Sequence, residues 1–129
     1  MADAPPTILV VDDDPAIVEL ITFALEREGI AIVGAADGRE AIEALEQRPA
    51  PGQFCLMLLD LMMPQVDGIL VLRYLHHHPG PTPPVVVVSA YPALLQDALD
   101  AGARGVLRKP FGVDELLAVV RRYCSTAQK

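Results

Sequence analysis

Five short apolar stretches, rich in β-branched residues, alternate along the chain with segments whose apolar residues recur at helical spacing. The stretches are apolar along their whole length, which is typical of strands buried on both faces of a parallel sheet. The chain therefore predicts an α/β fold, a doubly wound sheet of five parallel strands with helices on both faces. Strands are expected at Thr7–Val11, Ile30–Ala35, Phe54–Leu59, Val85–Val88 and Gly105–Lys109.

Capping and stop residues bound the predicted helices. Asp14 is a suitable N-cap before Pro15, and Gly29 ends the first helix. Asp37 and Glu40 resemble a capping box for the second helix. Helices are expected at Pro15–Glu28, Asp37–Gln47, Gly68–Leu75, Pro92–Ala101 and Val113–Tyr123, with a stiff connector at Pro79–Pro84.

Length and composition narrow the class of protein. With 129 residues we expect one domain over 1–129, with a flexible N-terminus at 1–6 and a tail at 125–129. The net charge of −7 disfavours direct nucleic-acid binding, and neither a signal peptide nor a membrane-spanning segment is expected. Cys55 and Cys124 suggest no disulfide framework or metal spacing, so free thiols in a reducing compartment are expected.

Polar residues capable of chemistry follow four of the five predicted strands. Because the carboxyl ends of parallel strands meet at one edge of a sheet, we expect these residues to share one crevice. They are Asp12 and Asp13 after the first strand, Asp60 after the third, Ser89 after the fourth and Lys109 after the fifth. Asp60 alone could equally be a capping residue, but this convergence favours a functional site.

The charges of this set predict its chemistry. Clustered carboxylates repel unless a cation neutralises them, and Mg²⁺ prefers such oxygen ligands, with Mn²⁺ expected to substitute. Lys109 and Ser89 suit a phosphoryl oxygen, one as a charge and the other as a hydrogen-bond donor. Asp60 is then the expected nucleophile, forming an aspartyl phosphate.

At these residues the sequence resembles the receiver domain of two-component response regulators, in the chemotaxis-regulator-like superfamily. The motifs that carry the resemblance are Asp12-Asp13, the D-x-x-M-P-x-x-D-G pattern Asp60 to Gly68, Ser89-Ala90, and Lys109-Pro110-Phe111. It covers roughly Thr7 to Tyr123. It implies a flavodoxin-like fold with strand order 2-1-3-4-5 and a cis Lys109–Pro110 bond.

The resemblance also implies the roles of the site residues. Asp60 would be phosphorylated in a Mg²⁺-dependent reaction by a sensor histidine kinase or a histidine phosphotransfer protein. Asp13 would be the more direct metal ligand, Asp12 would act largely through water, and Met62 would contribute its backbone carbonyl. The chain would be a cytoplasmic, bacterial switch that loses its phosphoryl group by autodephosphorylation, rather than a turnover enzyme.

Output would pass through the face formed by the fourth helix, the fifth strand and the fifth helix, to an output domain, a partner protein or a second copy of the chain. The family usually carries an aromatic residue at the position of Val106, where it changes rotamer on phosphorylation. Val106 is stiff, so we expect that readout to be weak or replaced. In the family, the positions of Met62 and Tyr91 flank the path of the attacking water, so an apolar Met and a bulky Tyr predict slow autodephosphorylation. Ala90, which follows Ser89, is expected among the switch and access residues.

Alternative functions start from the same residues. A haloacid-dehalogenase-like phosphatase would use Asp12 as nucleophile and Asp14 as acid, although Asp14 as an N-cap is favoured. A receiver-like interaction module that does not switch is a third possibility. A serine hydrolase at Ser89 is disfavoured because the nucleophile-elbow glycines are absent, and His76-His77-His78 are expected to be a helix end rather than a metal site.

Overall fold

The computed structural model describes residues 5–47, 54–61, 68–78, 80 and 82–124. The strands are β1 (Thr7–Val11), β2 (Ala31–Ala35), β3 (Leu56–Asp60), β4 (Val85–Ser89) and β5 (Gly105–Arg108). The helices are α1 (Pro15–Glu26), α2 (Gly38–Gln47), α3 (Gly68–His76), α4 (Pro92–Asp100) and α5 (Val113–Tyr123). The predicted order of elements is confirmed. The largest differences are that β3 begins at Leu56 rather than Phe54 and α1 ends at Glu26.

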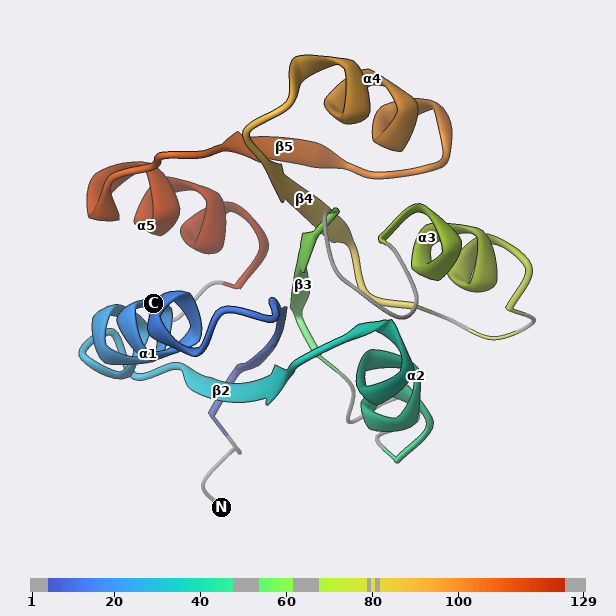
Figure 1. Cartoon of the computed structure of the whole chain (residues 1–129). Helices are drawn as coiled ribbons and strands as arrows, with labels where there is room; N and C mark the ends of the chain where they lie inside the picture. The colour runs from blue at the N-terminus through green and yellow to red at the C-terminus, as the bar shows by residue number, and fades with distance from the viewer. Residues whose placement is uncertain (1–4, 48–53, 62–67, 79, 81, 125–129) are drawn as a thin grey trace.

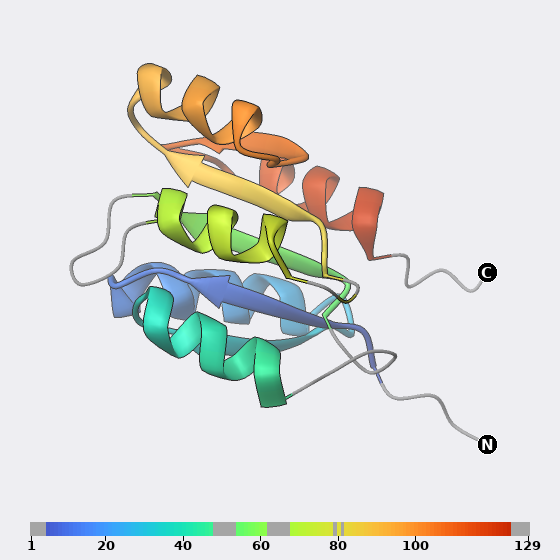
Figure 2. The ribbon, with the colours of Figure 1, turned by 90° about the vertical axis from the view of Figure 1, so that its right-hand side faces the viewer.

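The strands form one parallel sheet in the order β2-β1-β3-β4-β5. Helices cover both faces, with α1 and α5 on one side and α2 and α3 on the other (Figures 1 and 2). The predicted flavodoxin-like arrangement is therefore confirmed. No helix in the described part of the chain is long and apolar enough to cross a membrane.

Two apolar cores lie on opposite faces of the sheet. Successive residues of a strand point to opposite faces, so Ile8 and Val10 of β1 pack with α1 and α5, whereas Leu9 and Val11 pack with α2, α3 and α4. Every residue of β1, β3 and β4 is buried. This explains why these strands are apolar throughout, and it makes the sheet centre a rigid support for the residues that follow each strand.

Local capping follows the sequence expectations. Asp14 Oδ1 accepts a hydrogen bond from the Ala16 amide at 3.0 Å, so Asp14 is the N-cap of α1. The Glu40 amide donates to Asp37 Oδ1 at 2.9 Å, and Glu40 Oε1 accepts from the amide of Ala36, which precedes the cap, at 2.9 Å. Both contacts satisfy amides that have no partner inside the helix. The predicted cis bond between Lys109 and Pro110 is also confirmed.

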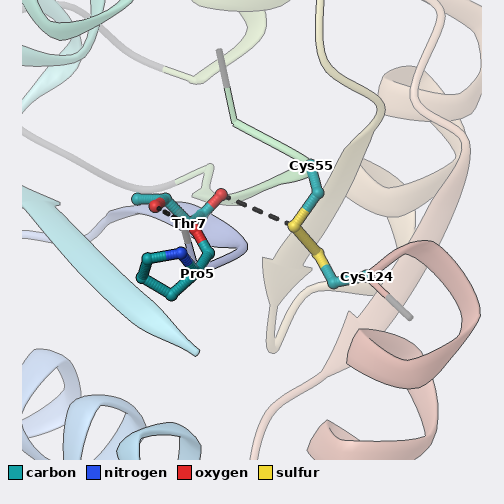
Figure 3. The surroundings of a disulfide bond; sticks show 4 residues. All are labelled: Pro5, Thr7, Cys55 and Cys124. Atoms are coloured by element: carbon teal, nitrogen blue, oxygen red, sulfur yellow. Dashed lines mark hydrogen bonds between the residues drawn. A yellow bond between two sulfur atoms is a disulfide. The ribbon is translucent and has the colours of Figure 1, made fainter. Parts of the chain in front are cut away.

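The expectation of free thiols at Cys55 and Cys124 is wrong. The two residues form a disulfide, with Cα atoms 5.5 Å apart across a sequence separation of 69. Cys55 precedes β3, and Cys124 is the C-cap of α5 (Figure 3). Sequence spacing alone could not reveal the pair, because only the folded sheet brings the end of α5 to the start of β3.

The histidine run lies at the end of α3, as expected. All three imidazoles are exposed, and His77 Nδ1 lies 2.9 Å from the Arg73 carbonyl oxygen. Within the described residues, the one group of three potential metal ligands that lie close together contains none of these histidines.

Candidate functional site

Three carboxylates gather at the carboxyl edge of the sheet. β1 and β3 are neighbours, with Val11 opposite Leu59, so the residues that follow each strand emerge side by side. One oxygen from each of Asp12, Asp13 and Asp60 lies within 4.8 Å of the others. Asp12 and Asp60 are each only 4% exposed, whereas Asp13 faces solvent. The predicted convergence of these acids is therefore observed.

Lys109 joins this group from the far edge of the sheet. Its Nζ lies 3.4 Å from Asp12 Oδ2 and 3.6 Å from Asp60 Oδ2. The backbone fixes the approach, because the Lys109 amide donates to the Ser89 carbonyl oxygen at 3.0 Å. One ammonium group thus contacts two nearly buried carboxylates, an arrangement in which charge interactions are stronger than in water.

Ser89 ends β4 beside the carboxylates and is 1% exposed. β4 pairs with β3 so that Val88 lies opposite Asp60, which places Ser89 one residue further along the neighbouring strand. Its Oγ accepts a hydrogen bond from the Tyr91 amide at 3.0 Å. The hydroxyl proton is therefore left to donate elsewhere.

Asp12 is held on both of its oxygens. Oδ1 accepts a hydrogen bond from the Asp14 amide at 2.9 Å, and Oδ2 faces Lys109. Asp14 itself caps α1 and does not belong to the carboxylate group. The phosphatase alternative needs Asp14 as an acid beside Asp12, and this capping contact gives Asp14 a different use.

The residues predicted to control access and switching lie on separate elements. Tyr91 is 56% exposed and is the N-cap residue of α4, and the neighbouring Ala90 is also exposed. Val106 lies on β5, opposite Val87, and is 39% exposed. Met62, the predicted backbone ligand, lies outside the described residues.

Gly68 packs closely against the backbone of Asp60 and Leu61, a contact that a search for functional side chains does not reveal. A Cβ atom at this position would lie 2.8 Å from both the Asp60 carbonyl oxygen and the Leu61 Cα atom. Those are backbone atoms, which cannot move aside as a flexible side chain can. The available signal was the Asp67-Gly68 pair, which the sequence indicated only as a turn and as part of a motif.

The donor set fits a divalent cation. Three carboxylates carry a formal charge of −3, and Lys109 contributes +1, which leaves −2 for a dication to offset. The ligands are all oxygen atoms, which Mg²⁺ and Mn²⁺ prefer. A cleft of about 490 Å³ between α1 and β2 is lined in part by Asp12, Asp13 and Glu40, so this side of the carboxylate group opens to solvent.

Comparisons with known proteins agree with this geometry. The model of the response regulator receiver domain matches residues 8–121. Response regulator MprA of Mycolicibacterium vanbaalenii is 40% identical over 120 residues, covering 91% of this chain and 49% of the relative. The DNA-binding dual master transcriptional regulator RpaA of Synechocystis is 40% identical over 120 residues, covering 90% and 48%. The chain thus spans about half the length of the curated relatives it matches.

Solved structures give the same result. The signal receiver domain of a response regulator from Bermanella marisrubri superposes with a TM-score of 0.83 at 35% identity, covering 93% of this chain and 98% of the other. A response regulator receiver domain from Francisella gives a TM-score of 0.80 at 33% identity, covering 92% and 95%. Sequence, fold and the acidic crevice therefore lead to one assignment: this chain belongs to the family of response regulator receiver domains of bacterial two-component systems.

Proposed function

We propose that Asp60 accepts a phosphoryl group from a sensor histidine kinase or a histidine phosphotransfer protein, in a reaction that requires Mg²⁺. The observation that carries this proposal is the position of Lys109, whose Nζ lies within 4 Å of oxygens of both Asp12 and Asp60. Three strands deliver these groups to one crevice, which supplies a nucleophile together with a cation to offset charge.

The proposed chemistry follows from the positions of the side chains. An Asp60 carboxylate oxygen bonds to phosphorus as the phosphorus–nitrogen bond of the donor phosphohistidine breaks. The imidazole nitrogen leaves with the electron pair and takes up a proton. Lys109 offsets the negative charge on the transferred oxygens, and the Ser89 hydroxyl can donate a hydrogen bond to one of them.

Asp12, Asp13 and Asp60 would hold the metal ion, with the Met62 carbonyl as a further ligand expected from the sequence. When bound, Mg²⁺ supplies positive charge to the phosphoryl oxygens. Mn²⁺ is expected to substitute. The carboxylate of Asp13 faces solvent, so a metal ion bound to it could exchange water ligands with solvent. Asp12, by contrast, is held by the Asp14 amide and by Lys109.

The signal would then leave through the surface of α4, β5 and α5, towards an output domain, a separate protein or a second copy of the chain. Leu99 and Val106 are exposed on this surface, at 40% and 39%. Since Val106 cannot swing as an aromatic ring does, we expect only small movement there, and free and phosphoryl-mimic structures would test this. Under the same proposal the chain acts in the cytoplasm and does not itself bind nucleic acid or a membrane.

Acetyl phosphate provides the test. Incubation with acetyl phosphate and Mg²⁺, followed by intact-mass measurement and peptide mapping, should give a single phosphoryl adduct on Asp60. The Asp60→Asn variant should give none, and Asp14→Asn, which retains an N-cap side chain, should behave as the wild type. Sustained phosphate release that depends on Asp12 and Asp14 but survives Asp60→Asn would support the phosphatase instead. No adduct with any donor would support a module that does not switch.

A further inference from the structure

The Cys55–Cys124 disulfide joins two elements far from the acidic crevice. Cys55 immediately precedes β3 and Asp60 ends it, so the two residues lie about 16 Å apart at roughly 3.3 Å per residue. The disulfide therefore belongs to the amino edge of the sheet, where none of the site residues lies. Figure 3 shows its position beside Thr7, whose carbonyl oxygen lies 3.5 Å from Cys55 Sγ.

The disulfide fixes the last turn of α5. Cys124 is 1% exposed, and its amide donates to the Val120 carbonyl oxygen at 2.7 Å. One turn earlier, Val120 is fully buried in the core formed with α1. The apolar packing of Val120 and Tyr123 also holds this end. The ion pair between Arg121 Nη2 and Glu28 Oε1 at 3.0 Å is weak because the Arg121 side chain is 62% exposed. Among the described contacts of this turn, the disulfide is the covalent constraint.

Residues 125–129 follow this turn in the sequence. A change in the order of the last turn of α5 would alter how any following segment leaves the domain. The disulfide therefore couples thiol chemistry to the last turn of α5 rather than to the phosphoryl site.

We infer that Cys55 and Cys124 form a reversible thiol–disulfide pair whose oxidation state controls the order of the last turn of α5, independently of Asp60. The reversibility rests on the proposed cytoplasmic function, because disulfides in that compartment are usually transient and redox-sensing. The two cysteines differ in access: Cys55 is half-buried, whereas Cys124 is almost fully buried. Attack therefore starts at Cys55.

The exchange is balanced with a cellular thiol as reductant. A first reductant thiolate attacks Cys55 Sγ, which forms a mixed disulfide and releases Cys124 as a thiolate. A second reductant thiolate attacks the reductant sulfur of the mixed disulfide, which releases Cys55 and leaves the reductant as its own disulfide. Two electrons and two protons pass from the reductant to the cysteine pair. Oxidised reductant drives the same steps in reverse.

The test is a glutathione titration of the wild-type chain, with the bonded fraction read by thiol alkylation and mass. The fraction should change within the range of reduced-to-oxidised ratios of glutathione buffers. Amide hydrogen exchange in the last turn of α5 should become roughly tenfold faster or more on reduction, while exchange in β1, β3 and β4 stays unchanged. Adduct formation on Asp60 with acetyl phosphate should stay within about twofold.

Single variants supply the matched control. Cys55→Ser and Cys124→Ser should show the exchange pattern of the reduced wild type under oxidising conditions. A pair that stays bonded, or stays open, at every glutathione ratio would overturn the inference. Equal amide hydrogen exchange in the oxidised and reduced states would also overturn it, and so would global unfolding of the wild type on reduction. Either result would mean that the disulfide does not control the last turn of α5 locally. A failure of Asp60 to accept a phosphoryl group, with the exchange result intact, would count against the proposed function alone.

Discussion

Lys109 and Asp12 form an ion pair, with 3.4 Å between Nζ and Oδ2, although 97 positions separate them in the sequence. The same Nζ lies 3.6 Å from Asp60 Oδ2. Lys109→Gln should therefore slow the formation of the Asp60 adduct from acetyl phosphate by roughly 100-fold or more, because charge on the transferred group is no longer offset. Intact-mass time courses measure this rate.

Arg108 offers the matched control for that substitution. It ends β5 next to Lys109 but is exposed. Arg108→Gln removes the same formal charge and should leave the rate within about twofold of the wild type, because exposed charges interact weakly. Equal losses in the two variants would mean that overall charge, rather than the contact with the carboxylates, controls the reaction.

Asp13 is the carboxylate of the site that solvent reaches, so its role can be tested without disturbing the core. Asp13→Asn should raise the Mg²⁺ concentration needed for half-maximal adduct formation by roughly tenfold or more, since a charged ligand is lost. The neighbouring Asp14→Asn should not shift that concentration, because Asn caps a helix as well as Asp does. A normal Mg²⁺ requirement in Asp13→Asn would remove Asp13 from the proposed ligand set.

Gly68 leaves no room for a methyl group. Gly68→Ala places a carbon 2.8 Å from the Asp60 carbonyl oxygen, so the free energy of unfolding should fall by about 1–3 kcal/mol. Urea denaturation measures this loss. At Gly112, by contrast, the nearest atom to an added Cβ is Glu115 Oε1 at 3.9 Å, so Gly112→Ala should cost less than about 1 kcal/mol. Equal losses of unfolding free energy in the two variants would show that close backbone contact does not require glycine at position 68.

Tyr91 tests the predicted shielding of the aspartyl phosphate. Its backbone amide donates to Ser89 Oγ, and alanine keeps this donor, so Tyr91→Ala removes only the ring. We expect the phosphoryl lifetime to shorten by roughly tenfold, because water gains access to the acyl phosphate. Tyr91→Phe keeps the ring and should preserve the lifetime. Loss of the phosphoryl group at the wild-type rate in Tyr91→Ala would mean that this exposed ring shields nothing.

Tyr74 gives a prediction on pH, at the contact between α2 and α3. Its hydroxyl donates to Glu46 Oε2 at 3.0 Å, and this hydrogen bond is the main reason that the pKa of Tyr74 rises above 10.0. The folded pKa is raised, so the contact between α2 and α3 contributes fully below pH 10.0 and is lost as pH rises through the folded pKa. Tyrosinate absorbance, taken as a difference from Tyr74→Phe, follows this titration. Glu46→Gln should bring the pKa of Tyr74 back towards 10.0, and no change would assign the shift to burial instead.

The parts of this fold that are local in sequence could be predicted. Apolar runs such as Val85–Val88 fix the strands because only burial on both faces suits them, and Asp14 caps α1 through a contact two residues away. The crevice was also predictable, because parallel strands must bring Asp12, Asp60 and Lys109 to one edge.

The features that the sequence did not reveal depend on distances between atoms that only the folded chain brings together. The Cys55–Cys124 pair arises because α5 runs back across the sheet and ends beside the start of β3. The space at Gly68 depends on the backbone of Asp60, which ends β3, and of Leu61, which follows it. Both features need tertiary contacts, which local propensity does not encode.

The length of β3 fixes both the packing of the two cores and the position of Asp60. Leu56 and Leu58 enter the core with α1 and α5, whereas Met57 and Leu59 enter the core with α2, α3 and α4. Deletion of one residue inside this strand would exchange the two sets and move Asp60 out of step with Asp12. Substitutions that conserve volume can be absorbed in β3, but insertions and deletions cannot. In any library built on this domain, viable changes of chain length should therefore be absent from the segment between Cys55 and Asp60.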